Sequence, residues 1–481
     1  MNEITSPEGA GAPSSAESTP LLPCHIIIAH PDKPKFLVIR HSGDHWSPPM
    51  LKVPVAGSIM YKPAMINRGM MKKYGLRTTV LRIVMEAQNY VLIELELHAS
   101  SKRQMQAVWV GREEYAQFKK RGDDDTDPFE FWLQEKEDGE VSDLRAPWQR
   151  YGWYQRADEW LTQKLVELGI QERGSIQQFK AGWPMACILR VSTSQGQVYL
   201  KSSYNKKPGE ARLTNLLAGK WPEHVPAPLA SDEASNWMVL RDFKLRNENI
   251  PSWNDLPEFA RVLGKIQVGL MDELENLKEI ECGNMNLDFL CNTDGRSQDL
   301  FESSVALLQE GQNALTDDDL DLFRSSVLEI HESCRELECF EIPDSLSHLD
   351  FRPDNLFVED GRYFVIDWAD VAITHPFMAL CRTLDFFEHY MNEDMALDGH
   401  DHIDQEVVNS MKDAYLANFV GFQPHEKLEE AFRIAYSIYP LFYFYYVAGQ
   451  IRLIEPGSPH SDLLVHLLKS RARILIRSGT E

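Results

Sequence analysis

A short strand-and-turn pattern stands inside an otherwise helical half of this chain, and it limits the folds that this half can adopt. The apolar segments 356–358 and 363–366 flank the sequence EDGR, which has the composition of a tight hairpin turn. From about residue 256 onward the spacing of apolar residues is helical, both before the hairpin and after it. The fold of this half must therefore hold two short strands within a body of helices.

The residues on both sides of the hairpin have the spacing that phosphoryl transfer requires. The sequence HLDFRPDN at 348–355 has the form H-x-D-x-x-x-x-N, and IDW follows the hairpin at 366–368. Such a reaction needs one carboxylate to accept the proton of the attacking hydroxyl group. It also needs an amide oxygen and a second carboxylate to hold Mg²⁺ at the nucleotide phosphates. Asp350 is the predicted base, and Asn355 and Asp367 are the predicted Mg²⁺ ligands.

These motifs resemble those of the aminoglycoside phosphotransferase and choline kinase-like group, relatives of the protein kinases, over residues 160–481. The resemblance implies an α+β, protein-kinase-like bilobal fold, with a small antiparallel-sheet lobe at 146–243 and a large helical lobe at 244–481. It also implies ATP, with GTP left open, and Mg²⁺ as cofactors. The Asp-Phe-Gly and Ala-Pro-Glu elements of protein kinases are absent, which favours a small-molecule acceptor. Within the motif, we expect His348 to support the loop and Arg352 to belong to the catalytic group.

Residues before this motif match the nucleotide-binding part of the same family. Lys201 ends a predicted strand where the family holds the nucleotide phosphates, and Glu210 in the next predicted helix would position it. The segment 238–243 would form the hinge between the lobes. Its residues Val239 and Arg241 are predicted to offer backbone groups to adenine. A turn covering the nucleotide would fall at 179–185, although it lacks the pattern G-x-G-x-x-G.

The acceptor site implied by the resemblance lies in the helical lobe. Asp385 and Glu388 are candidate ligands for a cationic or polar acceptor, such as an aminoglycoside or choline, within an acidic window after the catalytic motif. The alternative is that these acids are exposed charge on loops and helix faces. One departure from the family is Ala379, which stands where an aspartate commonly braces the catalytic loop. The further acids of the window are Glu393, Asp394, Asp398, Asp401 and Asp404.

The segment 23–145 resembles a Nudix hydrolase fold, with strands, a Pro/Gly turn, a helix and further strands in order. In that family the helix carries R-E-x-x-E-E-x-G, whose glutamates bind metal ions. Here RGMMKKYG occupies 68–75, with Gly69, Lys72 and Lys73 at the glutamate positions. Because two cations would repel Mg²⁺, we expect a non-catalytic domain with a binding, regulatory or packing role. An acidic stretch at 121–143 is predicted to be a linker or surface loop. The expected strands lie at 25–29, 35–39, 80–84 and 90–97, and the helix at 64–74.

The charge of the chain is unevenly distributed. The 481 residues carry a formal net charge of −24, but residues 1–150 hold 19 basic and 20 acidic residues, whereas 271–410 hold 7 and 34. This balance argues against nucleic acid or an anionic membrane surface as a partner. Residues 1–22 are predicted to form a disordered tail and not a signal peptide. Seven cysteines without a C-x-x-C motif favour reduced thiols in the cytoplasm.

Three functions are compatible with the sequence. The first is an ATP- and Mg²⁺-dependent phosphotransferase acting on a hydroxyl group of a small molecule. The second is a protein or peptide kinase of the same fold, and the third is a non-catalytic nucleotide-binding regulator. Asp350, Asn355 and Asp367 argue against the third. The sequence leaves open the identity of the acceptor and whether the protein is a monomer or a homodimer.

Overall fold

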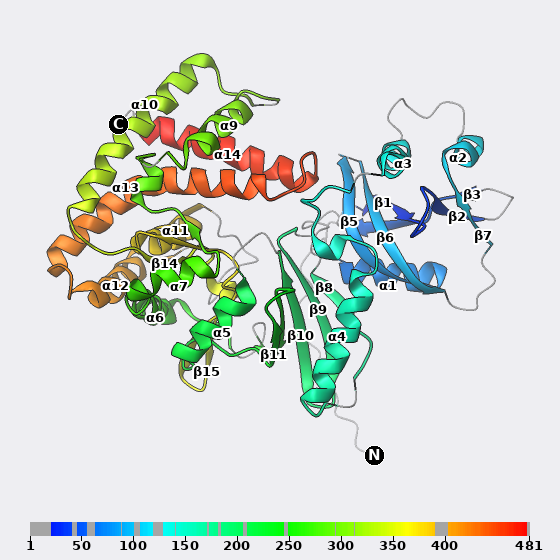
Figure 1. The fold of residues 1–481 in the computed structure, drawn as a ribbon, viewed down its shortest axis with the longest axis horizontal. Coiled ribbons are helices and arrows are strands. Elements are labelled where there is room, and N and C mark those ends of the chain that lie inside the picture. The colour runs from blue at the N-terminus through cyan, green and yellow to red at the C-terminus, as the bar shows by residue number, and fades with distance from the viewer. Residues whose placement is uncertain are drawn as a thin grey trace, which may run out of the picture. The chain divides into compact units, whose positions relative to one another are not determined.

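The chain divides into two compact units in a computed structural model, residues 1–139 and 140–481 (Figure 1). This division lies close to the predicted boundary at 145/146. The residues that the structure describes are 21–40, 46–54, 63–87, 89–100, 106–118, 128–139, 141–170, 173–180, 184–204, 209–244, 249–293, 295–311, 313–389 and 403–478. The predicted tail therefore lies almost wholly outside the described residues.

The described residues of the first unit form two small sheets and three helices. In the mixed sheet, order β4-β1-β6-β5, strand β1 runs parallel to β6 and antiparallel to β4. Alternating apolar residues of these strands form a core of their own, against which α1 packs. The mixed sheet consists of β1 (Leu21–Ile28), β4 (Met50–Pro54), β5 (Leu76–Ala87) and β6 (Tyr90–Ser100). The second sheet consists of β2 (Phe36–Arg40), β3 (Trp46–Ser47) and β7 (Ala107–Val110), and the helices are α1 (Pro63–Tyr74), α2 (Arg112–Phe118) and α3 (Pro128–Asp138).

Helix α3 corrects the prediction of a linker or surface loop at 121–143. Phe129, Trp132 and Leu133 are buried, and their spacing of three and four residues places them on one face of the helix. The ring of Phe129 stacks on that of Phe36 at 5.3 Å between centroids. The high acidic content of the stretch concealed this short apolar face of α3.

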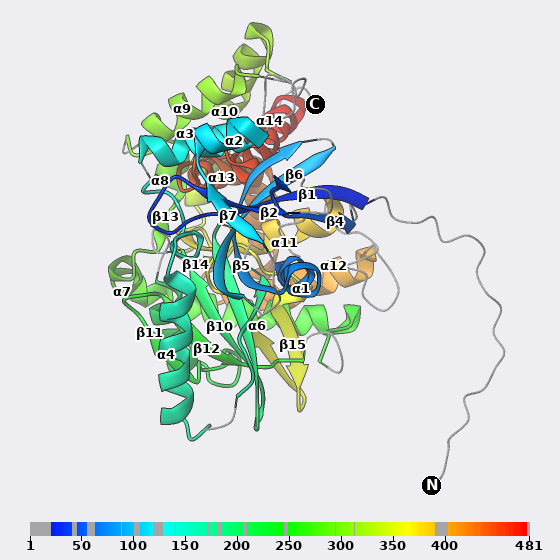
Figure 2. The ribbon, with the colours of Figure 1, turned by 90° about the vertical axis from the view of Figure 1, so that its right-hand side faces the viewer.

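The second unit begins with the small lobe that the sequence predicts. Its five-stranded antiparallel sheet has the order β11-β12-β10-β9-β8. Figures 1 and 2 show α4 lying along this sheet, where Trp153 and Trp160 contact Trp237 edge-on. The helices are α4 (Trp153–Glu167) and α5 (Glu210–Lys220). The strands are β8 (Gln177–Lys180), β9 (Ala186–Thr193), β10 (Gly196–Ser203), β11 (Ala230–Asp232) and β12 (Trp237–Arg241).

The large lobe is mostly helical, which confirms the bilobal α+β prediction. Its helices pack around one core that is continuous with the core of the small lobe. They are α6 (Leu256–Val268), α7 (Leu274–Glu279), α8 (Leu287–Leu290), α9 (Gln298–Leu308), α10 (Asp317–Glu338), α11 (Phe377–His389), α12 (Gln405–Leu416), α13 (His425–Arg452) and α14 (Pro459–Ser478). The apolar run at 439–451 lies in α13. Among the described helices, none is both long and apolar enough to cross a bilayer.

Two small sheets in this lobe position the predicted catalytic residues. The predicted hairpin is present as β15 (Leu356–Glu359) and β16 (Arg362–Val365). A three-stranded sheet, order β13-β17-β14, consists of β13 (Gly283–Asn284), β14 (Ser345–His348) and β17 (Val371–Thr374). Because β14 ends at His348 and β17 begins soon after the hairpin, this sheet fixes both ends of the catalytic segment.

Candidate active site

A buried ion pair joins β10 to α5. The Nζ of Lys201 lies 2.8 Å from Oε1 of Glu210, and both side chains are almost fully buried. Ser203, two residues further along the same face of β10, donates its hydroxyl group to the other carboxylate oxygen of Glu210. Helix α5 begins at Glu210, and the N–H of Ala211 donates to the side chain of Asn236. Glu210 is therefore oriented from both sides and holds the ammonium group of Lys201 in place.

Lys201 also contacts the large lobe. Its Nζ lies 2.6 Å from Oδ1 of Asp367, so the lysine lies between two carboxylates. Burial acts to lower the pKa of Lys201, but the charges of Asp367 and Glu210 outweigh it and raise that pKa above its ordinary value. Burial raises the pKa of the Glu210 carboxyl, against the opposing charge of Lys201. The lysine is therefore a fixed cation between the lobes.

The backbone at Asp367 adopts a conformation that few residues favour. Its φ of +64° lies in the left-handed region, which costs a residue other than glycine about 1–2 kcal/mol. Two contacts hold this turn: the N–H of Ile366 donates to the carbonyl of Asn355, and the indole N–H of the buried Trp368 donates to the carbonyl of Val365. The turn directs the carboxylate of Asp367 toward Lys201.

The catalytic loop places Asp350 and Asn355 in direct contact. The amide Nδ2 of Asn355 donates to Oδ2 and to the backbone carbonyl of Asp350, each at 2.8 Å. The amide nitrogen is thereby engaged with Asp350, so the amide oxygen is the atom of Asn355 that suits a metal ion. Asp350 itself is partly exposed, with 26% of its side chain accessible.

His348 supports this loop, as the sequence predicts. Its Nδ1 accepts a hydrogen bond from the N–H of Asp350 at 3.2 Å, so the ring hydrogen resides on Nε2, which lies 3.1 Å from the carbonyl oxygen of Ile366. The ring is fully buried, and burial lowers the pKa of His348. His348 is therefore a neutral link between the loop and the segment that carries Asp367.

Arg352 forms an ion pair with the predicted base. Its Nε lies 3.1 Å from Oδ1 of Asp350, and its guanidinium group lies over the ring of Phe386. The loop contains a second, longer ion pair, 3.8 Å from Arg352 to Asp354. This contact holds one carboxylate oxygen of Asp350 in a fixed orientation.

The position of Ala379, where the family commonly has a bracing aspartate, is buried in α11. One helical turn later, the hydroxyl oxygen of Thr383 lies 3.0 Å from the backbone carbonyl of Phe351, inside the catalytic loop. The same hydroxyl lies 3.0 Å from the carbonyl of Ala379. Thr383 therefore links α11 to the loop without a carboxylate, a contact that the sequence pattern did not indicate.

The predicted adenine contacts at Val239 and Arg241 lie in different surroundings. Val239 is fully buried in the middle of β12, and its carbonyl accepts a hydrogen bond from the N–H of Leu229. Arg241 ends the strand, and its side chain forms a bidentate ion pair with Glu359 at 2.6 and 2.8 Å. The carbonyl of Val239 is therefore used within the sheet, whereas a contact between the backbone of Arg241 and adenine stays a prediction.

An apolar cluster that the sequence analysis did not single out lies directly beyond this strand. Phe243 stacks on Phe357 at 4.9 Å between ring centroids, and Phe357 stacks on Phe364 at the same distance. Leu240 and Ile366 are partly buried against these rings. The cluster thus connects the end of β12 to the hairpin and to the segment leading into Asp367. The available signal was the pair Phe357 and Phe364, which the hairpin turn places opposite each other.

The candidate acceptor ligands Asp385 and Glu388 lie in different environments. Asp385 is 4% exposed, and both of its carboxylate oxygens are bonded to Arg471, at 2.8 and 3.0 Å. Tyr439 also donates to Asp385, so this carboxylate is structural and its prediction as an acceptor ligand is not supported. Glu388 is exposed at the end of α11 and accepts a hydrogen bond from Tyr436.

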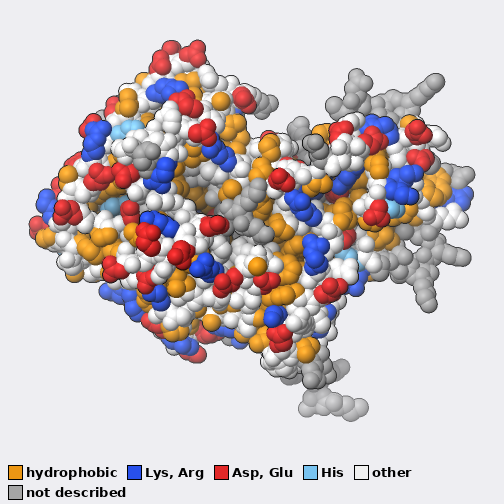
Figure 3. Space-filling model, viewed as in Figure 1, with side chains coloured by type: hydrophobic (Ala, Val, Ile, Leu, Met, Phe, Trp, Pro, Cys, Tyr) orange, Lys and Arg blue, Asp and Glu red, His pale blue; other side chains and the backbone are white. Residues whose placement is uncertain are grey.

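Other parts of the prediction lie outside the described residues. They are residues 181–183 of the predicted nucleotide-covering turn and the acidic residues Glu393, Asp394, Asp398 and Asp401. On the face shown in Figure 3, Asp and Glu side chains of the large lobe are spread over the surface among Lys and Arg. Asp404 precedes α12 at its N-cap position.

Comparisons with known proteins agree with this geometry. Residues 188–399 match the model of the phosphotransferase enzyme family. No curated protein matches the chain.

Solved structures similar to this chain include an ethanolamine kinase of Plasmodium vivax, which is 13% identical and has a TM-score of 0.44. The alignment covers 75% of this chain and 99% of that one. A choline kinase of Streptococcus pneumoniae is 13% identical with a TM-score of 0.41, covering 67% and 99%. An aminoglycoside phosphotransferase in complex with AMP-PNP and hygromycin B is 12% identical with a TM-score of 0.38, covering 67% and 98%.

The family match includes Lys201, Glu210 and the whole catalytic segment from His348 to Asp367. The similarity of this chain to the phosphotransferase enzyme family therefore lies in residues 188–399, which hold the candidate active site.

Proposed function

We propose that the second unit transfers the γ-phosphoryl group of ATP to a hydroxyl group of a small molecule, with Mg²⁺ as the metal ion. One observation carries the proposal: Lys201, held by Glu210, contacts Asp367, while Asp350 and Asn355 bond to each other on the adjoining loop. A cation for phosphates, oxygen ligands for a metal and a carboxylate for a hydroxyl proton are the groups that this chemistry needs.

The oxygen atoms at the site suit Mg²⁺. The amide oxygen of Asn355 and the carboxylate of Asp367, which is 37% exposed, are hard ligands of the kind that this ion prefers. Mg²⁺ bound there would neutralise charge on the nucleotide phosphates. Lys201 would contribute a second positive charge to the same phosphates. Glu210 would keep the side chain of Lys201 extended from β10.

Asp350 is the proposed general base. Its carboxylate would accept the proton of the acceptor hydroxyl as that oxygen attacks, which requires an ionised and oriented side chain. The amide group of Asn355 fixes one carboxylate oxygen of Asp350, and the guanidinium group of Arg352 lies beside the other. Together the two contacts fix the orientation of the carboxylate.

The aromatic cluster beyond β12 is the proposed floor of the purine site. Leu240 and Ile366 are only partly buried and lie against the buried rings of Phe243 and Phe357, and Ile366 directly precedes Asp367, the proposed metal ligand. A purine ring of ATP gains from contact with such an apolar surface. The same surface would accept GTP, so the choice between the two nucleotides depends on polar contacts beyond it.

The acceptor is proposed to be a small polar molecule. Two guanidinium groups, of Arg382 and Arg471, lie 4.6 and 4.4 Å from the centre of the Tyr443 ring. This ring is therefore already used by cations of the protein itself. With Asp385 also engaged by Arg471, neither group is an open site for a quaternary ammonium ion.

For the first unit we propose a non-catalytic role. The helix that corresponds to the expected metal-binding helix is α1, and it carries Gly69, Lys72 and Lys73. Lys73 donates to the backbone carbonyl of Met50, and Lys72 is exposed. Neither side chain can ligate Mg²⁺, so a Nudix-like hydrolysis is not expected here. All seven cysteines are free thiols, in keeping with the proposed cytoplasmic location.

Transfer of labelled phosphate from [γ-³²P]ATP tests the proposal. The full chain is incubated with Mg²⁺ and separate acceptors: aminoglycosides, choline, ethanolamine, homoserine and sugars. Label in one acceptor, lost in Asp350→Asn, supports a small-molecule phosphotransferase. Label in added protein substrates instead would support a protein kinase. Tight ATP binding without label in any acceptor would support a nucleotide-binding regulator and contradict the proposal.

A further inference from the structure

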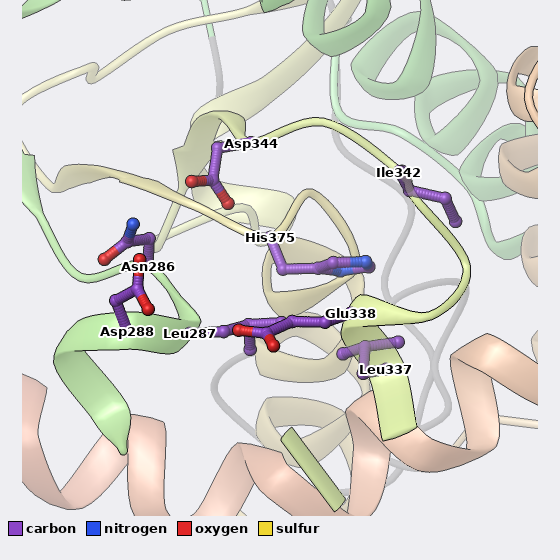
Figure 4. Close-up of a pocket in the computed structure, with 8 residues that line it drawn as sticks. All are labelled: Asn286, Leu287, Asp288, Leu337, Glu338, Ile342, Asp344 and His375. Carbon is purple, nitrogen blue, oxygen red and sulfur yellow. The ribbon is translucent and has the colours of Figure 1, made fainter. Parts of the chain in front are cut away.

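A pocket opens at the end of the three-stranded sheet that is opposite the catalytic loop (Figure 4). Its volume is about 190 Å³, and its walls come from α8, the end of α10, the segment before β14 and the residue after β17. A cavity of about 150 Å³ is large enough to hold benzene, so this pocket has room for a small organic molecule.

Three carboxylates line this pocket. Asp288 and Glu338 are exposed at its rim, and Asp344 is partly buried. Burial raises the pKa of Asp344 against a hydrogen bond with Asn286, and the charges of Asp288 and Glu338 raise it further against that of Lys278. Basic groups nearby have other partners: Lys278 pairs with Glu275, and Arg296 donates to Asn286. The pocket therefore favours a positively charged occupant.

His375 adds a different requirement. The side chain is 2% exposed and projects into the middle of the lining residues in Figure 4. Its Nδ1 accepts a hydrogen bond from the N–H of Phe377 at 3.3 Å, so the ring hydrogen resides on Nε2. Nε2 has no hydrogen-bond partner among the described residues. Burial lowers the pKa of His375 to about 3, so the ring is a neutral donor that needs an oxygen acceptor.

We propose that this pocket binds a small organic amine that also carries an oxygen atom, as in an amino ether or amino alcohol. The ammonium group would bind the carboxylates of Glu338 and Asp344, and the oxygen would accept from Nε2 of His375. A bare metal ion fits less well. In the described part of the chain, the only ligand group close enough for one is Asp413, His425 and Glu429, which is elsewhere.

This site is separate from the phosphoryl-transfer site. Strand β14 runs from the pocket, beside Asp344, to His348 at the catalytic loop, and its four residues span about 13 Å. Its partner β17 runs back in the opposite direction and ends next to His375. Binding in the pocket should thus be independent of the catalytic carboxylate.

Isothermal titration of the full chain with 2-methoxyethylamine tests the proposal, because this amine has no hydroxyl group to be phosphorylated. Two matched probes have the same number of heavy atoms: butylamine lacks the oxygen, and 2-methoxyethanol lacks the charge. We expect 2-methoxyethylamine to bind in the millimolar range, butylamine several-fold more weakly, and 2-methoxyethanol not at all at about 10 mM.

Variants locate the binding. The single variant Glu338→Gln changes an exposed position, and a double variant adds Asp344→Asn. Each should weaken the binding of 2-methoxyethylamine roughly tenfold or more. Glu329→Gln, which removes the same charge from another exposed position of α10, should not change it, nor should Asp350→Asn. His375→Phe should abolish the preference over butylamine. The proposal is overturned if 2-methoxyethylamine does not bind at about 10 mM. It is also overturned if the pocket variants bind this amine as well as the unchanged protein does, or if Asp350→Asn loses binding.

Discussion

Lys201 and Asp367, 166 residues apart in the sequence, lie 2.6 Å apart and connect the small lobe to the large one. The lysine is fixed on its other side by Glu210, so the contact couples a sheet residue, a helix residue and a strained turn. Phosphates and a metal ion have to meet at such a point, because the reaction needs both lobes to bind one nucleotide.

Replacing Lys201 by methionine should weaken both nucleotide binding and folding. Glu210 would be left as a buried carboxylate without its cation, which costs about 3–5 kcal/mol of the free energy of unfolding. Lys201→Met with Glu210→Gln should recover much of that loss but not the affinity for ATP. Urea denaturation and nucleotide titration measure the two effects, with Lys220→Met on α5 as control. Equal ATP affinity in Lys201→Met would contradict the assigned role.

Asp367→Asn should remove metal-dependent nucleotide binding while the fold is kept. Asparagine tolerates the left-handed backbone at this position, so the change removes charge with little strain. We expect the affinity for Mg²⁺-ATP to fall by roughly tenfold or more. Asp360→Asn is a matched control, because Asp360 also has a positive φ, of +52°, and lies in the hairpin turn. If Asp367→Asn and Asp360→Asn lost the same affinity for Mg²⁺-ATP, the effect would not be specific to the site.

Thr383 is expected to act on catalysis by positioning the loop. Thr383→Val removes the hydroxyl contact to the carbonyl of Phe351 with little change in volume, which should cost about 1–2 kcal/mol of loop stability. kcat should fall, KM for ATP should stay constant, and Thr383→Ser should restore kcat. If Thr383→Ser were as impaired as Thr383→Val, packing of the methyl group would be the cause.

The first unit should lose stability in acid because of Glu94. Burial acts to raise the pKa of Glu94, but Arg82 at 2.7 Å and Lys136 at 3.0 Å outweigh it and lower that pKa to about 2. A pKa that is lower in the folded state gives stability above pH 4.5, which is lost as the pH falls toward 2. The lowered pKa of Glu94 contributes about 3 kcal/mol to the free energy of unfolding at neutral pH.

Hydrogen exchange of peptides from β5 and β6 measures this loss between pH 5 and 3. In Glu94→Gln the protection should depend much less on pH, because the titrating group is gone. Glu86→Gln changes an exposed glutamate of the same sheet and should behave as the unchanged protein. An identical pH dependence in Glu94→Gln would mean that other groups cause the acid loss.

The sequence predicted the elements whose pattern is local. Apolar residues flank a clear turn in the hairpin, whose strands were expected within one residue of their bounds, and Lys201 was expected in a strand, which is β10. Strand β14 was not expected, because its sequence SLSH is polar. Ser345 is nonetheless fully buried, because its hydroxyl group donates to the carbonyl of Gln267 on α6, which no local pattern reveals.

The same distinction applies to the site. Asp350, Asn355 and Asp367 follow from one short motif, and the structure brings them together with Lys201. Asp385 was misassigned because its partner Arg471 is 86 residues away and occupies the carboxylate that looked open in the sequence. Charge counts locate acids along the chain, but whether an acid is exposed depends on partners that tertiary structure supplies.

The role of Asp350 is tested most directly by comparing turnover and nucleotide affinity in Asp350→Asn. The variant keeps the shape of the side chain and removes the proton acceptor. The acceptor is the one that takes up label in the [γ-³²P]ATP experiment. With it, kcat should fall by roughly 10²–10⁴, and the Kd for Mg²⁺-ATP should change by less than about threefold. Asp354→Asn, an exposed aspartate of the same loop, should retain kcat. Full turnover in Asp350→Asn would contradict the account.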